Sequence, residues 1–123
     1  MSINYDLGIK GEEIAQQHII NKGYTILETN WHYRNKEIDI IAIDKKTLVI
    51  LEVKTRTYGE NLPKLPEESV GKAKQKNLIE AANAYVEMKE IELEVRFDII
   101  SVTFFSEIKQ KIEHIEDAFT PRW

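Results

Sequence analysis

The stretch "EIDIIAIDKKTLVILEVK", residues 37–54, constrains the fold more than any other part of the sequence. Two apolar runs rich in β-branched residues flank a short polar turn, a pattern that predicts two antiparallel strands. A two-residue loop and a four-residue loop both give the register in which Ile43 lies opposite Leu48. A three-residue loop would add a bulge and break this pairing, and no glycine-rich turn decides between these loop lengths.

In this register Asp39 lies directly opposite Glu52, and Glu37 lies opposite Lys54. Because side chains alternate across a strand, the four charged groups are expected on one face and a purely apolar set on the other. The apolar set is Ile38, Ile40, Ala42, Val49, Leu51 and Val53. Two opposed carboxylates with Cβ atoms about 5 Å apart would repel each other by roughly 3 kcal/mol at an effective dielectric constant near 20.

A bound cation would relieve this repulsion, and Mg²⁺ or Mn²⁺ favours carboxylate oxygens. A shared proton, a further Lys or Arg, or simple exposure of the strand ends to water would also explain the charges. In a metal site, Asp39 and Glu52 would be ligands together with the Val53 carbonyl. Lys54 would orient the nucleophile and neutralise developing charge, as in a phosphodiesterase centre. Glu37 is either a further ligand or a partner for Lys54, and we favour the second.

The remaining elements are expected in the order α-β-β-β-α-β-β. The helices are predicted at about 6–22 and 67–89, and the strands at 24–31, 37–43, 48–54, 95–105 and 108–115, with a loop at 58–69. A helical connection normally joins parallel strands, so this order predicts one mixed sheet with helices packed on it. The length of 123 residues and the lack of a linker favour a single domain over residues 1–123.

Composition excludes several classes of protein. The chain has no cysteine, which rules out disulfides and thiolate metal sites. No apolar run approaches the roughly 20 residues of a membrane span, and no signal-peptide pattern is present, so we expect a cytoplasmic protein without a membrane partner. The net charge is −4, but residues 31–76 carry ten Lys or Arg against seven Asp or Glu, so this part could face a polyanion.

The same residues carry a family resemblance. Asp39, followed after twelve residues by "EVK", resembles the D…(D/E)xK signature of the restriction-endonuclease-like superfamily, also written PD-(D/E)xK, which includes Holliday-junction resolvases. Nearly the whole chain resembles the YraN-like family of small bacterial proteins. The matching segments are "GIKGEEIAQQHI" at 8–19, "TNW" at 29–31, "EIDIIA" at 37–42, "LEVKTR" at 51–56, "KQKNLIEAANAYV" at 74–86, "RFDIISV" at 96–102 and "AF" at 118–119. Lys36 departs from the pattern, because a glycine is expected there.

The resemblance implies an α/β fold with a three-layer restriction-endonuclease-like core around a mixed central sheet. It implies catalytic roles for Asp39, Glu52 and Lys54. By analogy with resolvase-like relatives, Glu12 on the first helix would complete the metal site, although a plain surface glutamate is an alternative. Gln75, near the start of the second helix, would be an auxiliary polar residue of the site.

These expectations combine into a nuclease that depends on Mg²⁺ or Mn²⁺ and acts on DNA, with branched or damaged DNA as the suggested substrate form. The expected contacts to nucleic acid are Arg34, Lys36, Arg56 and Lys74. The alternative is a non-catalytic nucleic-acid-binding or protein-assembly module that retained the nuclease fold. A homodimer is compatible with either function.

Overall fold

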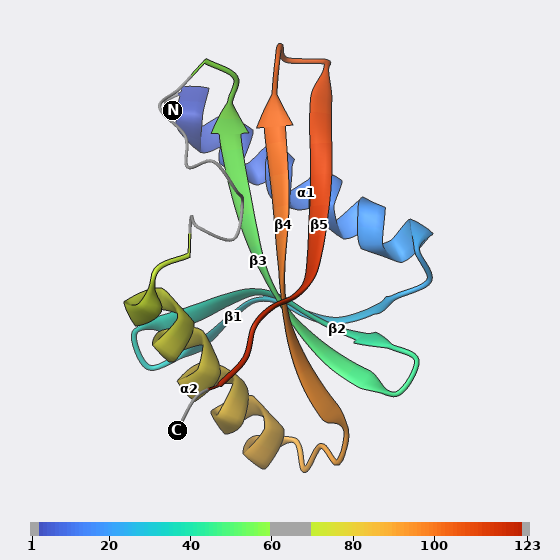
Figure 1. The fold of residues 1–123 in the computed structure, drawn as a ribbon, viewed down its shortest axis with the longest axis vertical. Helices are drawn as coiled ribbons and strands as arrows, with labels where there is room; N and C mark the ends of the chain where they lie inside the picture. The colour runs from blue at the N-terminus through green and yellow to red at the C-terminus, as the bar shows by residue number, and fades with distance from the viewer. Residues whose placement is uncertain (1–2, 60–69, 122–123) are drawn as a thin grey trace.

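Five strands form one mixed sheet, and one helix covers each of its faces (Figure 1). The computed structural model describes residues 3–59 and 70–121. The elements are α1 (Ile3–Asn21), β1 (Thr25–Tyr33), β2 (Lys36–Asp44), β3 (Thr47–Thr57), α2 (Lys72–Met88), β4 (Glu94–Phe104) and β5 (Gln110–Phe119). The α-β-β-β-α-β-β order and the α/β class are therefore confirmed. Within the described residues, no helix is both long enough and apolar enough to cross a membrane.

The strands lie in the order β1-β2-β3-β4-β5, and only β3 and β4 run parallel. The α2 crossover supplies this parallel pair, as a helical connection should. The β2–β3 pairing follows the predicted register, with Ile43 opposite Leu48 and Asp44 opposite Thr47. The tight turn at residues 45–46 is therefore the two-residue alternative, with Lys45 at a φ of +57°.

Each face of the sheet has its own apolar core. The α1 side contains Ala15, Ile19, Tyr24, Ile40, Ala42, Val49, Leu51, Ile100, Val102 and Phe104. The α2 side contains Ile38, Ile41, Leu48, Ile50, Val70, Leu78, Ile79, Ala81, Ala82, Tyr85, Phe97 and Ile99. The prediction that Ile38 shares a face with Ile40 and Ala42 is therefore wrong. Strict alternation fails between Ile38 and Ile40, where the neighbouring strand β1 contains Asn30 with a left-handed φ of +50°.

Helix α1 packs closely on β3 because Gly11 has no side chain. A Cβ atom at Gly11 would overlap Thr55 Oγ1 on β3. Helix α2 begins at Lys72 rather than near Glu67, and residues 67–69 lie outside the described part of the chain. Gly71 is extended, and Val70 before it is buried in the α2-side core, so the chain enters the helix one turn later than predicted.

A buried network of charged, hydrogen-bonded side chains connects the end of α1 with β4 and β5. The Asp98 carboxylate is 1% exposed and accepts hydrogen bonds from Arg96 Nε at 2.9 Å and from His114 Nε2 at 2.7 Å. Lys22 Nζ lies 2.8 Å from His114 Nδ1 and donates to it, which fixes the other ring nitrogen as the donor to Asp98. Burial alone would raise the pKa of Asp98, but these hydrogen bonds hold it below its usual value.

Candidate metal centre

The pairing of β2 with β3 gives way to a side-chain contact at Asp39. The paired residues run from Asp44 and Thr47 to Ile40 and Leu51. One residue further along β2, Asp39 Oδ2 accepts a hydrogen bond from the Val53 backbone N–H at 2.8 Å. A carboxylate thus replaces a backbone carbonyl as the acceptor for β3. This substitution places the Asp39 side chain at the junction between the two strands.

Glu12 and Glu37 meet Asp39 at this junction. Carboxylate oxygens of the three residues lie within 4.8 Å of one another, close enough to share one cation. Glu12 comes from α1, so the predicted approach of a first-helix acid to the strand acids is present. The nearby Asn30 side chain on β1 favours the ionised form of Glu12 and so lowers its pKa. Asn30, which has a positive φ, lies opposite Asp39, because its neighbours Thr29 and Trp31 pair with Ile40 and Ile38.

Glu52 approaches Asp39 from the α2 side of the sheet. Glu52 is only 3% exposed, and it lies close enough to Asp39 for that residue to raise its pKa. Two cations lie nearby, because Glu52 Oε2 is 3.9 Å from Lys54 Nζ and 3.3 Å from Lys74 Nζ on α2. The structure therefore brings the predicted Asp39, Glu52 and Lys54 together, and it adds Lys74 from the second helix.

The acids of this cluster resist ionisation. Burial raises the pKa of Glu52 to about 8, and the neighbouring Asp39 adds to this effect while Lys74 and Lys54 offset part of it. Burial also raises the pKa of Glu12 to about 7, with further contributions from the negative charges of Asp39 and Glu37. Such shifts are typical of sites in which like charges are held together for a function. A cation bound among these acids would favour their ionised forms.

Glu37 has a different ionic partner from the one expected. Its carboxylate lies 3.0 Å from His32 Nε2, while Lys54 pairs with Glu52. The preference for Glu37 as the partner of Lys54 was therefore wrong. The reason lies in the break of alternation near Ile38, which turns the start of β2 relative to its later half. Glu37 thereby joins the acid cluster instead of the lysine.

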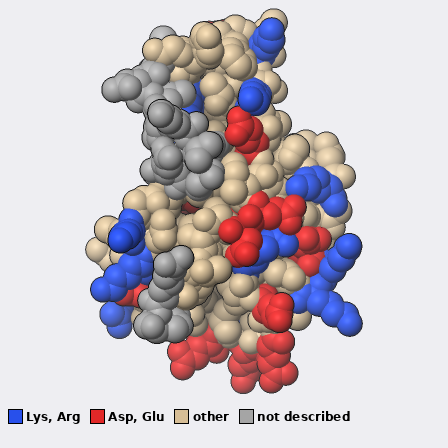
Figure 2. Space-filling view, viewed as in Figure 1, with Lys and Arg blue, Asp and Glu red and all other residues tan. Residues whose placement is uncertain are grey.

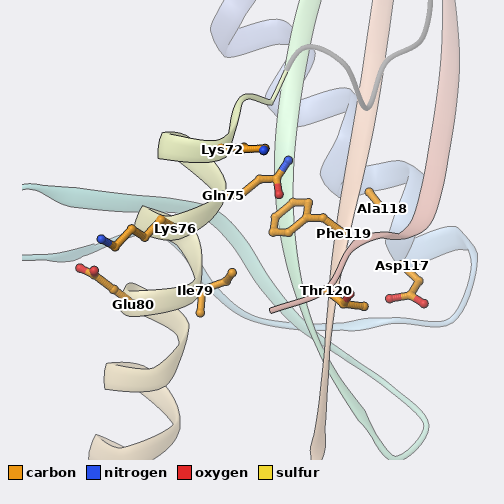
Figure 3. Close-up of a pocket in the computed structure, with 9 residues that line it drawn as sticks. All are labelled: Lys72, Gln75, Lys76, Ile79, Glu80, Asp117, Ala118, Phe119 and Thr120. Carbon is orange, nitrogen blue, oxygen red and sulfur yellow. The ribbon is translucent and has the colours of Figure 1, made fainter. Parts of the chain in front are cut away.

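Gln75 lies in a hollow between α2 and the end of β5 (Figure 3). The hollow has a volume of about 810 Å³, and Gln75 and Lys72 point into it toward Phe119. The Gln75 amide donates a hydrogen bond to the Val70 carbonyl at 2.9 Å, which supports the entry into α2. The contact that the structure gives Gln75 is thus structural, and its role beside the acids stays a prediction.

The basic residues expected to contact nucleic acid occupy different surroundings. Arg34 lies in the β1–β2 turn, with its guanidinium over the Tyr33 ring at 5.2 Å. Lys36 is tied to α2, since its Nζ is 3.1 Å from Glu80. Lys74 pairs with Glu52, as described above. Figure 2 shows Lys and Arg side chains both near α2 and on the opposite side of the molecule, with Asp and Glu side chains between them.

Two features of the site were not recognised from the sequence. Asn30 appears in the sequence analysis only within the segment "TNW". An asparagine in a strand gives no indication that its side chain will lie near a glutamate on a helix. Lys74 was expected as a nucleic-acid contact, and its ion pair with Glu52 depends on how α2 is docked. Both interactions join residues from different elements, so spacing along one strand cannot reveal them.

Fold and site together define an α/β protein with a nuclease-like core and a cluster of acids where β2 meets β3. The model of the family described as "Uncharacterised protein family UPF0102" matches residues 11–102. The chain belongs to this family, which confirms the resemblance to YraN-like proteins. It is 46% identical over 123 residues to a UPF0102 protein of Flavobacterium psychrophilum, and the match covers 97% of this chain and 98% of the relative.

Similar relatives occur in other bacteria. A UPF0102 protein of Parabacteroides distasonis is 41% identical over 119 residues, with 97% of this chain and 96% of the relative covered. A UPF0102 protein of Geobacter metallireducens is 43% identical over 117 residues, with coverage of 94% and 93%. These matches span both helices and all five strands.

Proposed function

We propose that this protein is a divalent-metal-dependent endonuclease that hydrolyses phosphodiester bonds in DNA. The observation that carries the proposal is the convergence of Glu12, Glu37 and Asp39, whose carboxylate oxygens lie within 4.8 Å of one another, with Glu52 beside Asp39. Two of these acids have pKa values raised to about 7 and about 8. A cation at this point would stabilise all three carboxylates at once.

The donor set fits a hard divalent cation. Carboxylate oxygens are what the site offers, and Mg²⁺ and Mn²⁺ prefer such ligands. Glu12, Glu37 and Asp39 bring oxygens close enough to hold the ion together. Glu52, which lies beside Asp39, and the Val53 carbonyl are further candidate ligands. When bound, the metal supplies an acidified water and stabilises negative charge on the phosphate.

The protein's own residues would position the substrate. Lys54 is 31% exposed and lies 3.9 Å from Glu52, so its ammonium can reach both the metal ligands and a phosphate in solvent. There it would orient the nucleophile and neutralise the charge that develops in the transition state. Lys74 would add a second positive charge from α2. A duplex with a branch or a damaged site is the substrate form that the family resemblance favours.

One observation favours a second function. Lys54 and Lys74 both pair with Glu52, so the protein's own cations already compensate part of the acidic charge. A non-catalytic DNA-binding or protein-assembly module that retained the nuclease fold would need no more than this. The two functions differ in metal binding and in catalysis, which can be measured separately.

Metal binding is tested by thermal melting with and without Mn²⁺ for the wild type, Glu12→Gln and Glu13→Gln. Glu13 is the exposed neighbour of Glu12 on α1 and serves as the matched control. A ligand at 100 times its Kd stabilises a protein by about 2.7 kcal/mol, which is a shift of roughly 10 °C for a domain of this size. We expect this shift for the wild type and Glu13→Gln and a much smaller one for Glu12→Gln. Equal shifts in all three proteins would contradict the metal centre.

Catalysis is tested on branched and fully paired DNA with Mg²⁺ or Mn²⁺. Lys54→Ala should abolish cleavage and keep the Mn²⁺-induced melting shift, because Lys54 is not a metal ligand. Asp39→Asn should lose both. Cleavage that persists in purified Asp39→Asn would refute the nuclease. A melting shift in the wild type without cleavage of any branched or paired DNA would favour the non-catalytic module.

A further inference from the structure

A row of functional side chains leads along β3 away from the acid cluster. Side chains alternate across a strand, so Glu52, Lys54, Arg56 and Tyr58 share the face that points to α2. The ion pair of Glu52 with Lys74 fixes that face, and Thr55 meets α1 on the other face. At about 3.3 Å per residue, Tyr58 lies roughly 20 Å from Glu52 along the strand.

The row ends in an exposed pair of aromatic rings. Tyr58 is 69% exposed and Phe105 is 44% exposed, and their ring centroids lie 5.0 Å apart at an interplanar angle of 40°. Backbone hydrogen bonds hold the pair in place, from Tyr58 N–H to the Phe104 carbonyl at 2.8 Å and from Phe105 N–H to the Lys109 carbonyl at 2.8 Å. Large apolar groups held rigidly in water usually mark a binding surface.

Positive charges border these rings. Lys109 Nζ lies 6.0 Å from the centroid of the Phe105 ring. Lys10 Nζ donates to the Glu107 carbonyl at 3.0 Å beside a hollow of about 420 Å³, which lies between α1 and the β4–β5 turn. Within residues 3–59 and 70–121, neither lysine forms an ion pair with a carboxylate. Figure 2 shows this upper end of the molecule as mainly uncharged, with Lys or Arg at its margin.

We propose that Tyr58 and Phe105 form a stacking platform for an unpaired base of DNA, about 20 Å from the bond that is cleaved. The inference rests on the proposed function and narrows its substrate to DNA with a single-stranded arm or gap beside the cleavage point. Exposed rings bordered by cations are how proteins hold unpaired bases without reading their sequence.

The residues between the two ends of the row fit this substrate. Lys54 and Arg56 would face the phosphates that connect the stacked base with the cleaved bond. Arg56 Nη2 is buried and has no hydrogen-bond partner among the described residues. An apolar protein partner would make no use of this line of cations. The Glu107 carboxylate beside the hollow opposes DNA, so Glu107→Gln should strengthen binding.

The test compares the affinity of the full chain for two fluorescein-labelled DNAs by anisotropy, in EDTA so that cleavage cannot occur. One is a blunt duplex, and the other is the same duplex with a thymidine arm of about 12 nucleotides, within the site sizes of single-strand-binding folds. The test variant is the double substitution Tyr58→Leu and Phe105→Leu, which keeps apolar bulk and removes the rings. The control is Ile108→Ala, because Ile108 is 91% exposed on the same turn.

The wild type should bind the armed duplex more tightly than the blunt one, and the double leucine variant should lose about tenfold in affinity for the armed duplex only. Ile108→Ala should bind as the wild type does. Equal affinities of the wild type and the double leucine variant would overturn the platform. An equal loss in Ile108→Ala would also overturn it, since a general apolar contact would then be responsible. Wild-type protein that binds both DNAs equally would refute the platform and leave the DNA nuclease standing.

Discussion

Replacing Asp39 by Asn separates the charge of this residue from its hydrogen bond. Asparagine keeps an oxygen that can accept from the Val53 N–H, and it removes one negative charge from the cluster. In the metal-free protein Glu12 and Glu52 have pKa values of about 7 and about 8, so both are mainly protonated at pH 5 and ionised at pH 9. The charge of Asp39 should therefore matter at high pH and hardly at all at low pH.

The size of the effect follows from the geometry. Oxygens of Glu12 and Asp39 lie within 4.8 Å, and two unit charges at that distance repel by about 3 kcal/mol at an effective dielectric constant of 20. Lys54 and Lys74 offset part of the repulsion. We expect Asp39→Asn to change the free energy of unfolding little at pH 5 and to raise it by about 1–3 kcal/mol at pH 9.

The sign of the pH dependence is set by the direction of the shifts. The unfolded chain releases the protons of Glu12 and Glu52 near their ordinary pKa of 4.5, whereas the folded protein keeps them until pH 7–8. Their contribution to stability is thus complete at low pH and is lost as the pH rises from about 5 to 8. The wild type should show a steeper loss than Asp39→Asn over this range.

Urea denaturation at pH 5, 7 and 9 in EDTA measures these differences. Asp44→Asn is the matched control, since Asp44 lies on the same strand and its carboxylate pairs with Arg96 at 3.5 Å. That variant should gain no stability at pH 9. If Asp39→Asn is destabilised equally at pH 5 and pH 9, the residue acts mainly through its hydrogen bond and the reasoning from charge repulsion is refuted.

Three further predictions concern packing and charge. Gly11→Ala should destabilise the protein by about 1–3 kcal/mol, because the added methyl group would overlap a β3 side chain. Gly8→Ala adds a methyl group that meets nothing within 4 Å and should stabilise the protein by up to about 1 kcal/mol. Urea denaturation measures both changes. Asp98→Asn should cost about 3–5 kcal/mol on the same measurement, because it leaves buried cations without their partner. Lys74→Ala should tighten Mn²⁺ binding several-fold in calorimetric titration, since it removes a cation that competes for Glu52; unchanged affinity would exclude such competition.

Much of the fold follows from local patterns in the sequence. The apolar runs and the turn at residues 45–46 determine the β2–β3 register, and the α2 crossover determines the parallel pair. The predicted register holds as far as Ile40 opposite Leu51 and ends before Asp39, but Asp39 and Glu52 still lie close together, as predicted. The start of α2 was not predictable, because Val70 is drawn into the core and delays the helix.

The rest of the site depends on contacts between distant elements. The left-handed Asn30 and the break of alternation at Ile38 turn Glu37 toward Glu12, and no single-strand pattern contains that information. The Asp98–His114 pair was also missed, since the two residues lie on different strands and His114 lacks any ligand-like spacing. Tertiary packing decides such interactions, and it changes which side chains meet without changing the order of the elements.

The acids of the cluster reach Asp39 from both layers of helices, Glu12 from the α1 layer and Glu52 from the side that faces α2. An ion bound at Asp39 would therefore contact α1 through Glu12 and would affect the α2 side through the neighbouring Glu52. Helices α1 and α2 lie on opposite faces of the sheet. The exchange of their amide protons with solvent should nevertheless slow together when the ion binds. Binding of one ion would in this way be detected as slower amide exchange in both helix layers.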